Sequence, residues 1–154
     1  MGMQYLNCHP LILASLALSI ACGGTPPDAK SGENAATPPK TFAEQVSRGG
    51  ELYGAHCSNC HGKGGEGTPD APAVVGASAL PLEPPSGAKV RKSQFVTVAD
   101  VANFVVQNMP ADAPGSLSEE DYFSVLAFDL KANGIELDKK LDGALATSLT
   151  IPRK

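Results

Sequence analysis

Two cysteines and a histidine stand close together in the run Cys57-Ser58-Asn59-Cys60-His61. Two thiols separated by two residues can each add to a vinyl group of the same porphyrin, and the imidazole that follows can bind its iron. A C-x-x-C-H run is the attachment sequence of c-type haem. The run therefore predicts one haem c, bound covalently through Cys57 and Cys60, with His61 as the proximal iron ligand.

The same residues allow other chemistry. Cys57 and Cys60 could form a disulfide or a thioredoxin-like redox pair, but the surrounding sequence shows no βαβ pattern. His56 and His61 could join the two thiols at a zinc ion, although structural zinc usually takes its four ligands from two separated pairs. Here all four candidates would lie within six consecutive residues. Haem attachment is the favoured interpretation.

Few residues could supply the second axial ligand. The chain contains three Met and three His, of which Met1, Met3 and His9 lie in an N-terminal segment that we expect to be removed. His56 lies on the same short segment as the thiols and cannot easily reach the opposite face of the ring. Met109 is therefore the expected sixth ligand, and the proline after it would end a helix there. The alternative is that Met109 fills a gap in the core.

Three stretches have patterns that predict helices to hold these residues in place. Phe42 to Ala55 carries apolar residues that can share one helix face and leads directly into the haem motif. A short helix is expected over Ala99 to Gln107, just before Met109. Ser118 should cap a third helix, with acidic residues near its positive end and with Asn133-Gly134 as its stop. Residues 77–95 form a long loop, which inside a compact domain should serve a function or line a cofactor.

The N-terminus indicates a secretory leader over residues 1–22. Residues 11–20 are an apolar run of about ten residues, too short to span a bilayer. Small residues precede Cys22, as in bacterial lipoprotein cleavage sites, where such a cysteine becomes the lipidated first residue. Ser19 stands where these sites usually have Leu, and residues 1–10 contain no Lys or Arg. The alternative is an ordinary secretory signal with Cys22 incidental. Either leader implies export to the periplasm or to the periplasmic face of a bacterial membrane.

Composition divides the mature chain into three parts. Residues 23–41 are rich in Pro, Gly and small polar residues, so they should remain a disordered linker. Residues 42–137 are left for one compact domain. Residues 138–154 extend past its last helix, and their apolar residues should pack on the body or on a partner. The formal net charge of −4 argues against nucleic acid as a partner.

From Phe42 to about Gly134 the chain resembles class I c-type cytochromes. Gly49 stands eight residues before Cys57, and Tyr53 four before it. That family has a glycine and an aromatic at these spacings, so that its first and last helices cross closely, and Phe128 matches the aromatic that packs over the glycine. The resemblance implies an all-α, cytochrome c-like fold of about three to four helices around a single covalently bound haem c.

The resemblance also implies roles for individual residues. Pro72 resembles the proline whose carbonyl accepts a hydrogen bond from the proximal imidazole, which would orient His61 and tune its basicity. Met109 sits where the family carries its axial methionine. Many members place a tryptophan against a haem propionate, and this chain has no Trp. The basic loop residues could meet that need, or they could form a solvated surface; they are Lys89, Arg91 and Lys92.

We expect one-electron transfer between protein redox partners from such a chain. With both axial positions filled by protein, no site is open for a substrate, so the chain itself would not be an enzyme. An alternative is the electron-accepting subunit of a periplasmic oxidoreductase such as a quinoprotein dehydrogenase. A less favoured one is a haem gas sensor, in which Met109 dissociates to admit a diatomic ligand. A lipid anchor at Cys22 would add the membrane as a partner.

Overall fold

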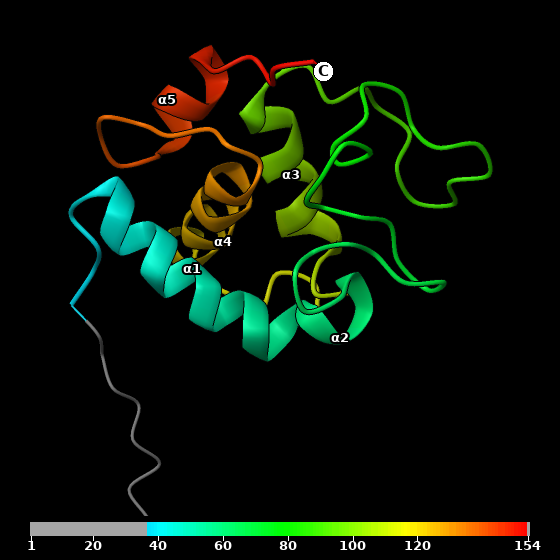
Figure 1. The fold of residues 1–154 in the computed structure, drawn as a ribbon, viewed down its shortest axis with the longest axis horizontal. Coiled ribbons are helices and arrows are strands. Elements are labelled where there is room, and N and C mark those ends of the chain that lie inside the picture. Colours follow the sequence, from blue (N-terminus) through cyan, green and yellow to red (C-terminus); the bar gives the residue numbers. More distant parts are fainter. Residues whose placement is uncertain (1–36, 154) are drawn as a thin grey trace, which may run out of the picture. The chain divides into compact units, whose positions relative to one another are not determined.

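The structure, a computed structural model, describes residues 37–153 of the chain. Five helices follow one another in this range (Figure 1). They are α1 (Phe42–His56), α2 (Ser58–His61), α3 (Val98–Asn108), α4 (Glu119–Ala132) and α5 (Gly143–Ser148). Extended segments in the described range pair only at an isolated antiparallel bridge between Thr97 and Thr150. The predicted all-α class is confirmed.

Several predictions concern residues that the structure does not describe. The leader over residues 1–22, most of the linker over 23–41 and the lipidation candidate Cys22 lie outside the described residues, so these assignments stay predictions. Within residues 37–153, no helix is long and apolar enough to cross a membrane.

Each of the three long helices begins at a residue whose side chain bonds to the first turn. Thr41 accepts a hydrogen bond from the Glu44 N–H at 3.2 Å, and the Glu44 carboxylate accepts one from the Thr41 N–H at 3.3 Å, which is a capping box. Thr97 and Asp100 form a second capping box, and the Ser118 hydroxyl caps α4. Because these signals are local in sequence, the predicted helix ends differ from the observed ones by one residue at most.

The first and last long helices cross at Gly49. A Cβ atom at this position would lie 1.9 Å from the carbonyl oxygen of Ser124 on α4 and 2.9 Å from the Cβ of Phe128. One turn further along α1, the ring of Tyr53 lies 5.1 Å from that of Phe128, centroid to centroid. The close crossing that the family resemblance implied is therefore confirmed, and it depends on a residue without a side chain.

Helix α4 occupies the centre of the described unit (Figure 1). It contacts α1 and α3, and α3 also contacts α5. Helix α2 and the long loop before α3 lie at the right of the same view, toward which the C-terminal end of α3 also points. The haem motif and Met109 thus stand at the ends of two helices that α4 holds together.

The extension after the last predicted helix belongs to the core. Leu141 and Ala146 are 0% exposed and Ile151 is 4% exposed. The fully buried side chain of Gln45 on α1 donates to the Leu141 carbonyl at 2.8 Å and accepts from the Leu141 N–H at 2.7 Å. Helix α5 is an element that the sequence analysis did not predict, since its six residues carry too little periodic pattern.

Candidate haem site

The two thiols of the C-x-x-C-H run lie one turn apart, with Cys57 at the residue between α1 and α2 and Cys60 on α2. The Cys57 N–H donates to the Tyr53 carbonyl at 2.9 Å and so continues the backbone of α1, while the Cys60 and His61 N–H groups both donate back to the Cys57 carbonyl. Cys57 is half-buried and Cys60 exposed, and both thiols are free. Residues three apart on a helix lie on one face, so one planar ligand can reach both thiols.

The environment of Cys57 argues against a reactive redox pair. Burial, followed by the charges of Asp129 and Cys60, raises the pKa of the Cys57 thiol to about 11. Thiols that exchange disulfides in C-x-x-C motifs have a lowered pKa, because the thiolate is the nucleophile. The zinc alternative gains no support either: within the described residues, no group of three or more His, Cys, Asp or Glu side chains could hold a metal ion.

The His61 imidazole is oriented by a backbone carbonyl. Its Nδ1 lies 2.8 Å from the carbonyl oxygen of Pro72. Because a carbonyl oxygen can only accept, Nδ1 carries the proton and Nε2 keeps its lone pair, which is the form of histidine that binds a metal. This is the contact that the family resemblance assigned to Pro72; its role toward an iron stays a prediction.

Pro72 is held in place by a loop folded back on α2. The Gly67 N–H donates to the His61 carbonyl at 2.7 Å, and the Thr68 hydroxyl donates to the Cys60 carbonyl at 2.6 Å. Tyr53 fixes the start of the same loop, since its hydroxyl donates to the Gly62 carbonyl at 2.8 Å. The segment between the haem motif and Pro72 is therefore tied to α1 and α2 at several points.

Met109 ends α3 and is anchored through its backbone. Its N–H donates to the Val105 carbonyl at 2.8 Å, and its carbonyl accepts a hydrogen bond from the hydroxyl of the buried Tyr122 on α4 at 2.6 Å. The side chain of Met109 is half-buried, and the Met109-Pro110 peptide bond is cis. Tyr122 is a residue that the sequence analysis missed, although an aromatic in the first turn of a capped helix is a signal of burial.

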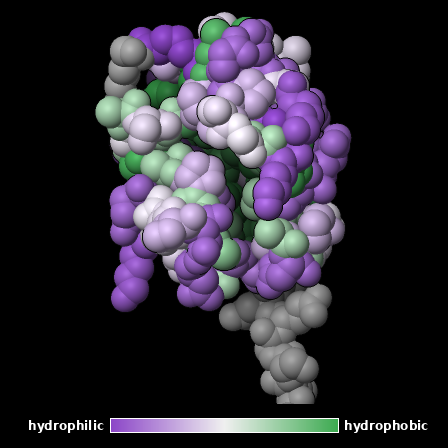
Figure 2. Space-filling view, turned by 90° about the vertical axis from the view of Figure 1, so that its right-hand side faces the viewer, coloured by the Kyte–Doolittle hydropathy of each residue, from purple (hydrophilic) through white to green (hydrophobic). Residues whose placement is uncertain are grey.

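The face that carries α2, α3 and the long loop is hollowed. Figure 2 shows hydrophobic residues at the bottom of a recess on this face, with hydrophilic residues around it. A narrow cavity also lies between α3 and α4. It is lined by six apolar side chains and one acid; these are Leu80, Val98, Val101, Leu126, Leu130, Ile151 and Asp129. Asp129 was not among the predicted site residues, although a charge within the apolar stripe of a helix is a signal in the sequence.

These residues fit a covalently bound haem. Two free thiols stand one turn apart, an imidazole keeps Nε2 available, and a thioether follows at the end of α3. An apolar cluster, as the porphyrin requires, packs with Cys57; its members are Leu52, Tyr53, Val74, Val125 and Phe128.

The three basic residues suggested as propionate contacts do not form one cluster. Arg91 is only 6% exposed, and its guanidinium stacks 3.5 Å above the centroid of the Phe95 ring. It donates to the carbonyls of Ser93 at 3.0 Å, of Pro81 at 2.7 Å and of Leu82. The buried guanidinium thus holds the two limbs of the loop together.

The two lysines lie at the surface. Lys92 Nζ donates to the Ala88 carbonyl at 2.9 Å, and both Lys89 and Lys92 are exposed. A contact between any of these three basic residues and a propionate stays a prediction.

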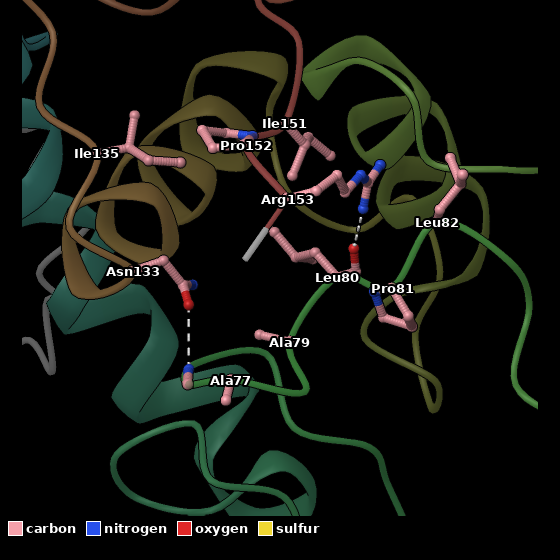
Figure 3. A pocket seen from close by; sticks show the side chains of 11 residues that line it. Ala77, Ala79, Leu80, Pro81, Leu82, Asn133, Ile135, Ile151, Pro152 and Arg153 are labelled. Carbon is pink, nitrogen blue, oxygen red and sulfur yellow. Dashed lines mark hydrogen bonds between the residues drawn. The ribbon is translucent and has the colours of Figure 1, made fainter.

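A second pocket lies between the start of the long loop, the end of α4 and the C-terminal segment (Figure 3). Asn133 accepts a hydrogen bond from the Gly76 N–H at 3.0 Å on one side, and Arg153 donates to the Leu80 carbonyl at 2.8 Å on the other. Its volume of about 160 Å³ is below that of usual ligand sites. None of the predicted haem-binding residues lines it.

Comparison with known proteins establishes the class that fold and site define. The family model described as "Cytochrome C oxidase, cbb3-type, subunit III" matches residues 44–128, more than half of the chain. The chain belongs to this family of class I-like c-type cytochrome domains, and membership implies haem c binding. No curated protein matches the chain.

Two solved structures are similar to the chain. One is the sulfane dehydrogenase SoxCD from Paracoccus pantotrophus, with a TM-score of 0.53 and 23% identity over 88% of this chain and 69% of that one. This similarity shows the cytochrome c fold. The other is the thiosulfate dehydrogenase TsdBA from Marichromatium purpuratum, with a TM-score of 0.41, 26% identity and coverage of 55% of this chain and 17% of that one. A TM-score of that size does not establish a common fold.

Proposed function

We propose that the chain carries single electrons between redox proteins, using one haem c attached to Cys57 and Cys60 and ligated by His61 and Met109. The observation that carries this proposal is the hydrogen bond between His61 Nδ1 and the Pro72 carbonyl, next to two free thiols one turn apart. When bound, the haem supplies an iron that accepts and releases one electron.

The chain's own residues prepare this transfer. Cys57 and Cys60 would hold the haem covalently, and the Pro72 carbonyl, by accepting from Nδ1, would leave His61 Nε2 free to bind the iron. Met109 would supply a thioether ligand, which favours the reduced iron and so would raise the potential. With His61 and Met109 both bound to the iron, no coordination site would be left for a substrate, so the chain itself would not be an enzyme.

The test is the absorption spectrum of the haem-loaded protein. We expect a low-spin spectrum with the charge-transfer band of Met-ligated ferric iron, and the loss of this band in Met109→Ala. Val106→Ala is the matched control, because Val106 is 39% exposed on the same helix, and it should keep the band. An unchanged spectrum in Met109→Ala would refute the ligand assignment. His61→Ala should fail to hold haem normally.

A second candidate is the electron-accepting subunit of an oxidoreductase complex. The family is described by a subunit of an oxidase, and one chain of the dehydrogenase SoxCD shares the fold. The long loop and the C-terminal segment could form the docking surface, since Arg153 bonds to the carbonyls of Leu80 and Phe95 and so joins them. Isolation of the tagged holoprotein under mild conditions separates the two: a stoichiometric oxidoreductase favours the subunit, and a monomer favours the free carrier.

Ligand binding tests the gas-sensor alternative. Rapid binding of carbon monoxide to the ferrous protein would favour it, because Met109 would have to leave the iron. Slow or absent binding would favour a closed, six-coordinate haem and hence the carrier.

We further propose that the protein is exported and attached to a bacterial membrane by a lipid at Cys22. The support is the run of small residues before Cys22 after an apolar stretch. Metabolic labelling with a fatty acid and detergent partitioning of the wild type and of Cys22→Ser would test it. Label on the wild type alone is the expected result, whereas a water-soluble, unlabelled wild type would indicate an ordinary secretory signal.

A further inference from the structure

The buried side chain of Asp129 has no part in the electron transfer proposed above. It lies on α4, is 8% exposed, and its Oδ1 atom has no hydrogen-bond partner in the described part of the chain. The cavity that it enters measures about 10 Å³, which is at the lower limit for one water molecule. Burying a charge without a partner is costly, so this carboxyl needs an explanation.

Asp129 lies beside the predicted haem site. Its charge helps to raise the pKa of Cys57 and of Tyr53, which requires it to be near both. Cys57 is one of the two predicted attachment points, and Val101, which lines the same cavity, is on the helix that ends at Met109. Neither His61 nor Met109 lines the cavity. Asp129 would therefore act on the haem through space.

Asp129 is a buried group beside Cys57 whose protonation changes near neutral pH. Burial raises the pKa of its carboxyl to about 8. From the side of α1 it faces Tyr53, whose pKa burial raises to about 12, and Cys57, which carries no proton once it is a thioether. The side chains that line the cavity from α3, from the long loop and from the C-terminal segment are all apolar.

We propose that Asp129 couples electron uptake at the haem to proton uptake from water, which makes the reduction potential of the protein fall as pH rises. The inference rests on the proposed function. A carboxylate is stabilised by a nearby positive charge, and the oxidised haem carries one positive charge more than the reduced one. Reduction therefore strengthens proton binding by Asp129, and ionisation of Asp129 favours the oxidised state.

The step balances in electrons and protons. The reduced redox partner loses one electron and the iron gains it. A carboxylate oxygen of Asp129 takes one proton from solvent in the same step, forming an O–H bond. When the iron passes its electron to the next partner, Asp129 releases its proton to solvent.

The experiment is a redox titration of the haem-loaded protein, followed by its spectrum, at a series of pH values from about 5 to 10 around the carboxyl's pKa of about 8. The wild-type potential should fall with rising pH across this range. Its slope can be no steeper than about 59 mV per pH unit, the equivalent of a tenfold change for one electron. Asp129→Asn should show little slope, with the wild-type potential at low pH and a higher potential at high pH. Asp138→Asn, at an exposed acid, should follow the wild type.

Each outcome decides the question. If Asp129→Asn keeps the wild-type slope, another group such as a haem propionate is responsible and the inference is wrong. A flat wild-type potential in a protein with a normal His/Met spectrum contradicts the inference and leaves the proposed function standing; a protein without that spectrum contradicts the proposed function itself.

A second measurement covers the case in which Asp129→Asn does not hold haem. Proton uptake by the wild-type holoprotein on reduction is measured in weakly buffered solution with a pH indicator, together with the redox-difference infrared spectrum. Uptake accompanied by a new protonated-carboxyl band supports the inference. Absence of uptake between pH 7 and pH 9, on either side of the pKa of about 8, overturns it.

Discussion

Hydrogen bonds to backbone atoms prepare both predicted axial positions. On one side the Pro72 carbonyl fixes the His61 ring; on the other, the Tyr122 hydroxyl holds the Met109 carbonyl. Each hydrogen-bond partner lies on another segment than the predicted ligand that it holds. The orientation of His61 and the position of the Met109 backbone therefore depend on how two segments pack together. Such hydrogen-bond partners orient metal ligands, and their loss typically weakens metal binding or activity.

Removal of the Tyr122 hydroxyl should loosen Met109. Tyr122→Phe leaves the carbonyl of Met109 without its partner, which should cost about 1–3 kcal/mol in unfolding free energy and lower the denaturant concentration at which the Met charge-transfer band is lost. Tyr53→Phe is the matched control, because it removes a comparable bond to the Gly62 carbonyl on the histidine side. The idea fails if the band of Tyr122→Phe is no more labile than that of Tyr53→Phe.

At the scale of elements, the crossing of α1 and α4 determines where α2 can lie. The helices approach through Gly49, and the contact between Tyr53 and Phe128 follows one turn later. Since Cys57 continues the backbone of α1, a change in this crossing moves the thiols relative to α4 and to Asp129.

Two glycines of α1 should therefore respond in opposite ways to alanine. Gly49→Ala places a Cβ 1.9 Å from the Ser124 carbonyl oxygen, and the overlap should destabilise the protein by about 1–3 kcal/mol or more. A Cβ at Gly54 meets nothing within 4 Å, so Gly54→Ala should stabilise the helix by up to about 1 kcal/mol. Denaturant unfolding of the two holoproteins measures both. Equal effects would mean that the crossing does not depend on Gly49.

At the scale of the whole described unit, the C-terminal segment closes the fold. The Ile151 N–H donates to the Val96 carbonyl, and the Val98 N–H to the Leu149 carbonyl. Ile151 also lines the cavity that holds Asp129. The segment therefore supports α3, the long loop and the apolar surroundings of the buried carboxyl at once.

Truncation of Ile151 should weaken the entire domain. Ile151→Ala empties part of a buried position, which should cost about 2–5 kcal/mol, seen as a lower midpoint in thermal or denaturant unfolding. Val90→Ala, at a residue that is 59% exposed, should change stability by no more than about 0.5 kcal/mol. If both variants unfold like the wild type, the segment does not contribute to the core.

Local patterns allowed the three long helices to be predicted almost to the residue. Caps such as Thr41 and Ser118 and the left-handed stop at Gly134, with a φ of 82°, act within a few residues of the helix ends. Helix α5 was missed because it is short and because packing on distant residues, such as Gln45, stabilises it. The loop contacts of Arg91 could not be predicted either, because tertiary packing brings its guanidinium to the carbonyls of Pro81 and Leu82; its contact with a propionate stays a prediction.

The chemistry predicted for the chain is visible in the order of its residues. Thiols, imidazole and their spacing lie within five residues, so the attachment motif is set before any tertiary contact forms. The tertiary structure alone decided the surroundings of that motif: the carbonyl that orients His61, the hydroxyl that holds Met109 and the burial of Asp129. These depend on contacts between segments far apart in the chain, and burial and hydrogen-bond partners are properties of the folded packing, which residue order does not display.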